Sequence, residues 1–239
     1  MTARPVLRVL APQAFSHALD ALAKRFTDAG GPAVEMGYGP ATGSSERAIT
    51  ARLDRGEVAD VALLPTRLLE ERSRTGLVLA ETSVEVLRSG IGLCVQQGQP
   101  VPDIGTVDAL RLVLLRARSV ALSQAGSGEY VAGQLLQRLG IESDVLGRCQ
   151  RFAQEPVAAV VARGDAELGF QQICELLPMP GIRLVGAMPE AVQHRTAVSA
   201  GVLVSSAQAE QALGFVRHLR SRAAVPVLAA AGLDAAADL

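Results

Sequence analysis

The chain is poor in aromatic side chains. Among its 239 residues it has no tryptophan, two tyrosines and five phenylalanines. Its 23 basic residues nearly balance its 24 acidic ones, and no basic block stands out along the sequence. Proteins that bind nucleic acids rely on basic surfaces and on aromatic side chains that stack on bases. We therefore expect no nucleic-acid partner.

Cysteine and histidine are also scarce. The three cysteines, Cys94, Cys149 and Cys174, lie far apart, and none of the three histidines stands at a metal-ligand spacing from them. Such cysteines are ordinarily small apolar core residues. The sequence also lacks a Walker loop, a dinucleotide-binding glycine pattern, and the GxSxG and HExxH motifs. We expect no metal site and no cofactor.

Long apolar runs are missing as well. No stretch approaches the roughly 18 uninterrupted apolar residues of a transmembrane helix. The first residues, MTARPVLRVLAP, lack the apolar centre and the small-residue cleavage site of a signal peptide. We expect a soluble chain without membrane insertion. A chain whose leader has been removed would read the same, so a cytoplasmic and a periplasmic location both stay open.

The most informative stretch is residues 119–141, SVALSQAGSGEYVAGQLLQRLGI. An apolar strand is followed there by a loop of small polar residues, SQAGSG, and then by apolar residues at helical spacing from Tyr130 to Leu139. Such a loop directs backbone N–H groups, serine hydroxyls and the positive end of the helix dipole at one small anion. A plain turn between a strand and a helix has the same pattern, so the other loops must be weighed with this one.

Three further polar loops each follow a predicted strand and precede a predicted helix. They lie near Gln13, at residues 39–45, and at residues 171–172. An N-cap of the helix that begins near Ala48 is an alternative role for Ser44 or Ser45, and it is compatible with ligand contact through the same N–H groups. Ligands of open α/β sheets bind at the carboxyl ends of the strands. We therefore expect the four loops to line a ligand-binding edge.

Alternating strand and helix patterns predict an α/β fold with two Rossmann-like lobes. One short strand is expected at residues 77–81. Two long, weakly charged segments, residues 84–95 and 196–204, are expected to cross between the lobes, the first with an interruption at residues 88–90. The predicted division is residues 1–86 plus 197–239 for one lobe and 87–196 for the other, with the ligand cleft between them in a monomeric protein.

Arg88 is the one cation in the first crossing segment. A guanidinium at a lobe junction suits a bidentate contact with a carboxylate or another oxyanion, although a solvated arginine on an edge strand would look the same. Together with the loops, it gives a set rich in N–H and O–H donors, which suits a small anion. The predicted ligand-binding residues are Gln13, Thr42, Gly43, Ser44, Ser45, Arg88, Ser89, Ser123, Ser127, Gly128, Tyr130, Gln171 and Gln172.

Several stretches, in their order and spacing, carry a family pattern. They include RLDRGEVADV at 52–61, LRSGIGLCV at 87–95, SGEY at 127–130, EPVAAVVARGDAELGFQQICELLPMPGI at 155–182 and SAG at 199–201. Nearly the whole chain resembles the type II periplasmic solute-binding proteins, in the branch that groups molybdate-binding-like proteins with bacterial aconitate isomerases. The resemblance implies the two-lobed architecture of that family, with two crossing strands.

The resemblance also implies a ligand class. Members of that family close on an oxyanion or a small carboxylate. They do so either for delivery to an ABC-type permease or, in the isomerases, to move a double bond in trans-aconitate. Molybdate-binding relatives usually have a serine where this chain has Ala14, and often a tyrosine where it has Gln172. An organic acid is therefore favoured over molybdate. The isomerase-like pattern SDSASGVY differs from SQAGSGEY at residues 123–130, where an aspartate and a serine are lost and a glutamate is gained.

Binding and catalysis make different demands on these residues. A binding protein needs only donors and a hinge, whereas an isomerase needs a base whose pKa suits proton transfer. Candidates for the base are Glu129, Glu155 and Tyr130, each of which also has an ordinary role as a first-turn carboxylate or a packing phenol. The leading interpretation is a solute-binding protein for a small organic di- or tricarboxylate. An aconitate isomerase-like enzyme and a molybdate- or oxyanion-binding protein are the alternatives.

Overall fold

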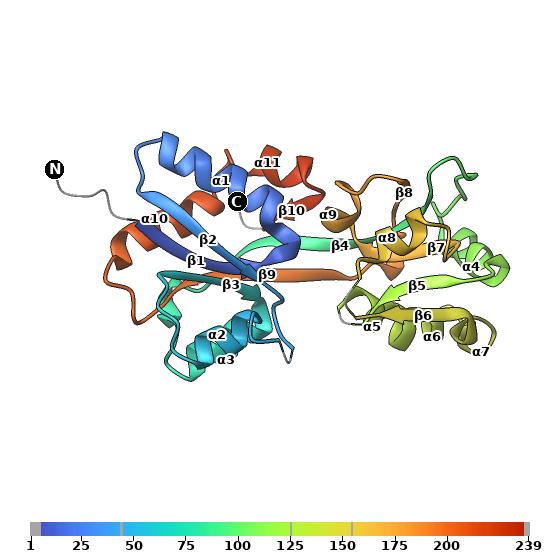
Figure 1. Ribbon diagram of the computed structural model, residues 1–239, viewed down its shortest axis with the longest axis horizontal. Coiled ribbons are helices and arrows are strands. Elements are labelled where there is room, and N and C mark those ends of the chain that lie inside the picture. Colours follow the sequence, from blue (N-terminus) through green and yellow to red (C-terminus); the bar gives the residue numbers. More distant parts are fainter. Residues whose placement is uncertain (1–5, 44, 125, 154, 237–239) are drawn as a thin grey trace. The chain divides into compact units, whose positions relative to one another are not determined.

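The chain divides into two compact units. The computed structural model describes residues 6–43, 45–124, 126–153 and 155–236. Unit 1 comprises Met1–Arg88 and Thr196–Leu239, and unit 2 comprises Ser89–Arg195 (Figure 1). The chain passes from unit 1 to unit 2 within strand β4 (Val84–Gln96) and returns at the start of strand β9 (Arg195–Val202).

Unit 1 begins as a regular alternation of strands and helices and ends with helices from the last part of the chain. Its elements besides β4 and β9 are β1 (Val6–Pro12), a 3-10 turn (Gln13–Phe15), α1 (Ser16–Asp28), β2 (Ala33–Gly39), α2 (Ile49–Asp54), β3 (Val61–Pro65), α3 (Thr66–Arg74), a 3-10 turn (Ala80–Thr82), α10 (Ala209–Leu219), α11 (Val225–Ala230) and β10 (Leu233–Ala235).

Strands of unit 1 follow the order β2, β1, β3, β9. The first three are parallel, and β9 runs antiparallel to β3. Helices α1 and α11 cover one face of this sheet, and α2 and α3 cover the other (Figure 1). Because both faces are covered, β3 is apolar throughout rather than alternating. Because β1, β2 and β3 are parallel, their carboxyl ends lie at the same edge of the sheet.

Unit 2 has the same alternation. Its elements besides β4 are α4 (Val107–Arg116), β5 (Val120–Ser123), α5 (Ser127–Tyr130), a π-helical stretch (Val131–Leu135), α6 (Leu136–Arg138), α7 (Glu142–Val145), a 3-10 turn (Leu146–Arg148), β6 (Cys149–Phe152), α8 (Val157–Ala162), β7 (Leu168–Gln172), α9 (Ile173–Leu176), β8 (Ile182–Ala187) and a 3-10 turn (Glu190–Val192).

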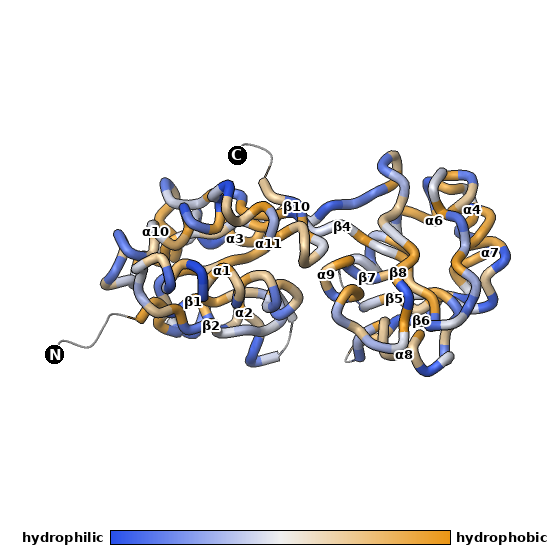
Figure 2. The backbone as a smooth tube through the Cα atoms, turned by 90° about the horizontal axis from the view of Figure 1, so that it is seen from above, coloured by the Kyte–Doolittle hydropathy of each residue, from blue (hydrophilic) through white to orange (hydrophobic). Residues whose placement is uncertain are grey.

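The sheet of unit 2 has the order β4, β7, β5, β6, with β8 also paired to β4. Side chains alternate between its two faces, as the pleat of a strand requires. Val120 and Leu122 pack into the core on the side of α4 and α6, whereas Ala121 between them packs against α8. Hydrophobic stretches, orange in Figure 2, lie inside each unit, and hydrophilic ones lie mostly in its loops.

Two predictions about local structure are wrong. Residues 77–81 do not form a strand, because only Val78 pairs, in an isolated bridge to Leu203, before the chain enters the 3-10 turn Ala80–Thr82. The predicted interruption at residues 88–90 is also absent, since β4 is continuous and residues on both sides of Gly90 belong to it. The side chains of Gln193 and Ile173 lie over Gly90. No helix in the described part of the chain is both long enough and apolar enough to cross a membrane.

Candidate functional site

In unit 2, the candidate residues gather at one edge of the sheet. Strands β5 and β7 are parallel, and they end at Ser123 and Gln172, respectively. Strand β4 is antiparallel to β7, with Ile91 opposite Gln172, so Ser89 lies at the same edge. Carboxyl ends of neighbouring parallel strands are where open α/β sheets bind ligands. The edge therefore has the position that the sequence predicted for a site.

The serine loop is closed by its own hydroxyls. The Oγ atoms of Ser123 and Ser127 are 3.2 Å apart, and the Gly128 N–H donates to Ser123 Oγ at 3.1 Å. Gly126 makes the turn possible, because its φ of 56° is in the left-handed region. Ser127 is buried and begins a helical segment that continues through the π-helical stretch into α6. The loop is thus a compact group of donors at the end of β5.

A second polar group surrounds Gln172. Ser89 Oγ donates to Gln172 Oε1 at 2.8 Å, and Cys174 Sγ lies 3.5 Å from Ser89 Oγ. This bond fixes the side-chain amide of Gln172, with its oxygen turned towards Ser89. Burial raises the pKa of the Cys174 thiol to about 12, so the group stays protonated at neutral pH. Cys174 is accordingly a weak donor here rather than a nucleophile.

The neighbouring Gln171 has a different environment. It is buried, its Oε1 accepts from the Ala158 N–H at 3.3 Å, and its side chain also bonds the Glu175 carboxylate. Glu175, in the first turn of α9, interacts with the Gln171 side chain and the Gln172 backbone N–H, and both contacts lower the pKa of its carboxyl. These bonds give Gln171 a structural role, although the sequence suggested both glutamines as ligand contacts.

The Glu175 carboxyl makes the stability of unit 2 depend on pH. Its removal from water raises its pKa, against the opposing effect of its bonds to Gln171 and Gln172. Because the folded state binds the proton more tightly than the unfolded state, this group stabilises less as the pH rises above its ordinary range of about 4 to 5. Glu175→Gln should therefore unfold at a higher urea concentration than the wild type at pH 7, with the gap closing towards pH 4.

The exposed Glu46→Gln variant is the matched control for the change of net charge. Its shift of the urea midpoint is subtracted from that of Glu175→Gln at each pH. If the remaining shift of Glu175→Gln is equal at pH 4 and pH 7, the carboxyl is not penalised by burial.

In unit 1, the candidate residues follow β1 and β2. Gln13 comes directly after β1, is exposed, and donates from Nε2 to Ser16 Oγ at 3.2 Å. Thr42, Gly43 and Ser45 are exposed in the loop after β2, and Ser44 lies outside the described residues. Pairing of Pro12 with Gly39 places the ends of β1 and β2 side by side. The two loops therefore leave the sheet together.

The helix after this loop does not have the cap that the sequence suggested. Helix α2 begins at Ile49 with Ala48 as its N-cap, and no side chain caps it. Its first N–H groups are satisfied by backbone carbonyls, Ile49 by Pro40 at 2.8 Å and Thr50 by Ala41 at 3.3 Å. The alternative role of Ser45 as a cap is wrong because the loop folds back on the helix and supplies these acceptors. Ser45 Oγ accepts instead from the Arg47 N–H.

Sequence reasoning missed one polar pair in unit 1. Thr66, the first residue of α3 after β3, has its Oγ1 2.9 Å from Ser199 Oγ of β9. The register of β3 with β9 puts Leu64 opposite Ser199, so this pair belongs to the same edge as Gln13. The sequence contained a signal for this pair. Thr66 directly follows a buried strand, which is the position at which the other polar loops were recognised.

Arg88 is the last residue of unit 1 and is already paired. Its Nε donates to Glu85 Oε1 at 2.7 Å, and about 40% of its side chain is exposed. The partly exposed ion pair is screened by water, so the guanidinium can exchange this carboxylate for another anion. The contact between Arg88 and a ligand stays a prediction.

Of the three candidate bases, two have their polar atoms engaged. The Tyr130 hydroxyl donates to the Val192 carbonyl at 2.8 Å and accepts from Arg138 at 3.0 Å, and its ring stacks on His194. Glu155 accepts from the Arg163 guanidinium, which lowers the pKa of that carboxyl. A lowered pKa makes a carboxylate a weaker base.

Glu129 is the remaining candidate. It is exposed in the first turn of α5, next to Gly128.

Among the described residues, no three His, Cys, Asp or Glu side chains lie together as metal ligands would.

Comparison with known proteins identifies the family. Residues 7–234 match the bacterial extracellular solute-binding proteins, and the chain therefore belongs to that family. An aconitate isomerase from a Pseudomonas species is 34% identical to it over 98% of this chain and 90% of that protein.

Solved structures agree on the fold. The periplasmic molybdate-binding protein of Azotobacter vinelandii superposes with a TM-score of 0.73 at 21% identity, covering 95% of this chain and 98% of that one. Peb3 of Campylobacter jejuni with bound L-phospholactate does so with a TM-score of 0.71 at 14% identity, covering 95% and 99%. The predicted α/β fold of the type II periplasmic-binding-protein class and the family resemblance are both confirmed.

Proposed function

We propose that this protein is a binding protein for a small organic di- or tricarboxylate. The observation that carries the proposal is the group of neutral polar side chains at the carboxyl edge of unit 2, where the hydroxyls of Ser123 and Ser127 follow β5 and the amide of Gln172 ends β7. Gly128 and Ser89 position them, because the Gly128 N–H donates to Ser123 Oγ and Ser89 Oγ donates to Gln172 Oε1. Neutral N–H and O–H donors stabilise an ionised ligand without a counter-charge or a metal.

The chemistry of the related proteins supports an organic anion. Peb3 has been solved with L-phospholactate, a small organic acid, and the relative with 34% identity is named for aconitate, a tricarboxylate. Ala14 and Gln172 replace the serine and tyrosine expected of a molybdate site, which counts against molybdate. Delivery of the ligand to an ABC-type permease by a monomeric binding protein, and closure of a cleft between the two units, belong to the same proposal.

Native mass spectrometry of the purified protein is the first test, because a bound carboxylate carried through purification would identify itself by mass. Calorimetry with trans-aconitate, cis-aconitate, citrate and molybdate then ranks the candidates. Saturable binding of one of the carboxylates, with weaker binding of molybdate, is the expected result. Preference for molybdate, or binding of none of these anions, would reject the proposed ligand class.

Ser127→Ala should weaken carboxylate binding by tens-fold without unfolding either unit. Loss of one hydrogen bond from a neutral donor to an ionised ligand costs roughly 1.5 to 3 kcal/mol. Calorimetry of the variant gives the answer directly, with Ser143→Ala, an exposed serine of α7, as the matched control. The titration is repeated with a strong chelator, because binding that disappears on chelation would show that a metal holds the ligand.

The aconitate isomerase relative favours a second function. An isomerase would take a proton from the methylene carbon of trans-aconitate, shift the double bond towards that carbon, and return a proton at the former vinylic carbon, so that atoms and charge balance. Glu129 is the candidate base, since the polar atoms of Tyr130 and Glu155 are engaged. Proton NMR of trans-aconitate incubated in deuterated water tests this, because turnover would produce cis-aconitate with deuterium at the new methylene.

A further inference from the structure

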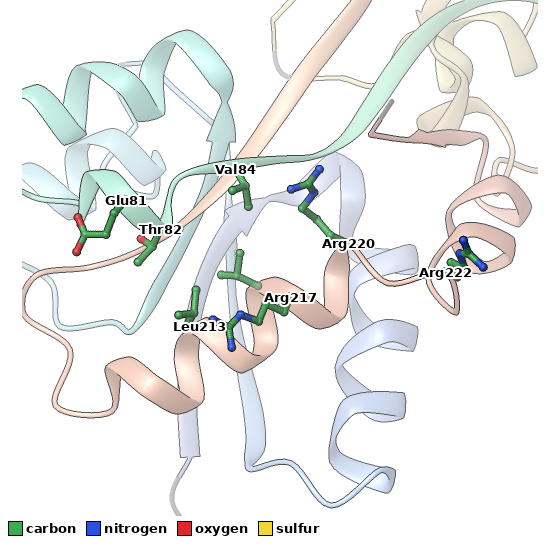
Figure 3. Close-up of a pocket in the computed structure, with 8 residues that line it drawn as sticks. Glu81, Thr82, Val84, Leu213, Arg217, Arg220 and Arg222 are labelled. Atoms are coloured by element: carbon green, nitrogen blue, oxygen red, sulfur yellow. The ribbon is translucent and has the colours of Figure 1, made fainter. Parts of the chain in front are cut away.

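Unit 1 contains a pocket far along the chain from the candidate loops. Its volume is about 540 Å³, within the range of small-molecule sites. One wall is formed by Glu81 and Thr82 of the 3-10 turn before β4, and the other by α10 and the chain that follows it (Figure 3). All of its lining residues belong to unit 1, so the pocket is complete within that unit.

The charge of this pocket is strongly positive. Among the residues that the structure describes, its lining contains Arg217, Arg220 and Arg222 and one carboxylate, that of Glu81. Figure 3 shows Arg217 and Arg220 at the end of α10, with Arg220 extending towards Val84, and Arg222 further along the chain. The three side chains are spread along the pocket, and an anion bound in it is attracted by their positive charges.

The helix dipole explains only part of this cluster. Arg217 lies in the last turn of α10 and Arg220 is its C-cap, where a positive charge is favourable. Arg222 lies beyond the helix. The final carbonyls are already satisfied by the backbone, that of Arg217 by the Arg220 N–H and that of His218 by the Ser221 N–H. The helix end therefore does not account for Arg222, and it needs no side-chain donor from Arg217.

Several other arginines of the protein are in ion pairs. Arg52 bonds Glu57, Arg163 bonds Glu155, and Arg195 bonds Glu190. By contrast, neither Arg217 nor Arg222 takes part in an ion pair with any residue that the structure describes. Their guanidinium groups present forked N–H donors that match phosphate and carboxylate oxygens.

The remaining lining sets the shape of a ligand. Val84, Leu213 and Val216 form an apolar surface, and the Thr82 hydroxyl is occupied by the Leu79 carbonyl at 2.6 Å and the Val202 N–H at 2.9 Å. Polar recognition thus falls to the arginines. We infer that this pocket is a second anion site, which takes a small molecule carrying two or more adjacent phosphate or carboxylate groups.

Calorimetry at low ionic strength tests the site with inorganic pyrophosphate, and with propane-1,2,3-tricarboxylate as the carboxylate probe. We expect one of the two to bind this pocket saturably, with one probe per pocket besides any tricarboxylate bound at the site of the proposed function, and the tighter of them at the pocket identifies the ligand group. The double variant Arg217→Gln, Arg222→Gln should weaken that binding about tenfold or more. Its matched control is Arg67→Gln, Arg74→Gln, which makes the same change of charge on α3, outside the pocket.

The control pair should bind the probe within about twofold of the wild type, since the effect belongs to the pocket and not to net charge. Three results would overturn the inference: no saturable binding of either probe, equal weakening in both double variants, or wild-type affinity in the pocket variant. The Ser127→Ala variant separates the two sites. Wild-type affinity for the probe in that variant supports a second site, whereas weakening of probe binding by Ser127→Ala would place the probe in the loops of the proposed function and reject the inference.

Discussion

Gly128→Ala should destabilise unit 2 by about 3 kcal/mol or more and abolish ligand binding. A Cβ atom at this position would lie 1.9 Å from the Ser123 carbonyl oxygen and 2.8 Å from the Ser123 nitrogen. Both neighbours are backbone, so no side-chain rotation can make room. The turn that places Ser123 against Ser127 would have to open, and with it the donor group at the end of β5.

The same helical segment offers a matched control. Gly133 lies in the π-helical stretch, and a Cβ added there would meet no atom within 4 Å. Because its backbone is helical, Gly133→Ala should be neutral or stabilising by up to about 1 kcal/mol. Urea unfolding of both variants and the wild type, followed by circular dichroism, gives the comparison. Equal midpoints for Gly128→Ala and the wild type would show that the turn can accommodate a Cβ atom at residue 128, which would contradict the prediction.

This contrast illustrates what the sequence can predict and what it cannot. The bounds of the helix Val157–Ala162 follow from local sequence signals, because Pro156 precedes the helix and Gly164 follows its end. Element ends of this kind depend on residues within a few positions of each other. Sequence reasoning handles them well.

The polar details depend on long-range packing. Gln171 and Gln172 are neighbours with the same side chain, yet one is buried against α8 and the other meets Ser89 at the edge of the sheet. Successive side chains of a strand point to opposite faces, but only the assembled sheet decides which face is covered by a helix. Likewise, the acceptors for the first N–H groups of α2 are backbone carbonyls, and these have no sequence signature.

Arg88→Ala should cost about 2 to 4 kcal/mol of affinity for the carboxylate ligand of the proposed function, a loss of roughly 30-fold to 900-fold. The reason is the removal of a charge-assisted, bidentate contact from a residue on β4, adjacent to Ser89. The variant should fold normally, since the Arg88 pair with Glu85 is partly exposed and such pairs contribute little to stability.

Glu85 makes this prediction sharper, because its carboxylate competes with a ligand for the same guanidinium. Glu85→Gln removes the competitor, keeps the shape of the side chain, and should bind the carboxylate as tightly as the wild type or more tightly. Arg88→Lys keeps the positive charge but loses the planar fork, so it should fall between the wild type and Arg88→Ala. Calorimetry of the three variants against one ligand therefore has an expected order of affinity. If Glu85→Gln and Arg88→Ala weaken binding equally, the ion pair itself supports the site, and Arg88 is not the anchor of the carboxylate.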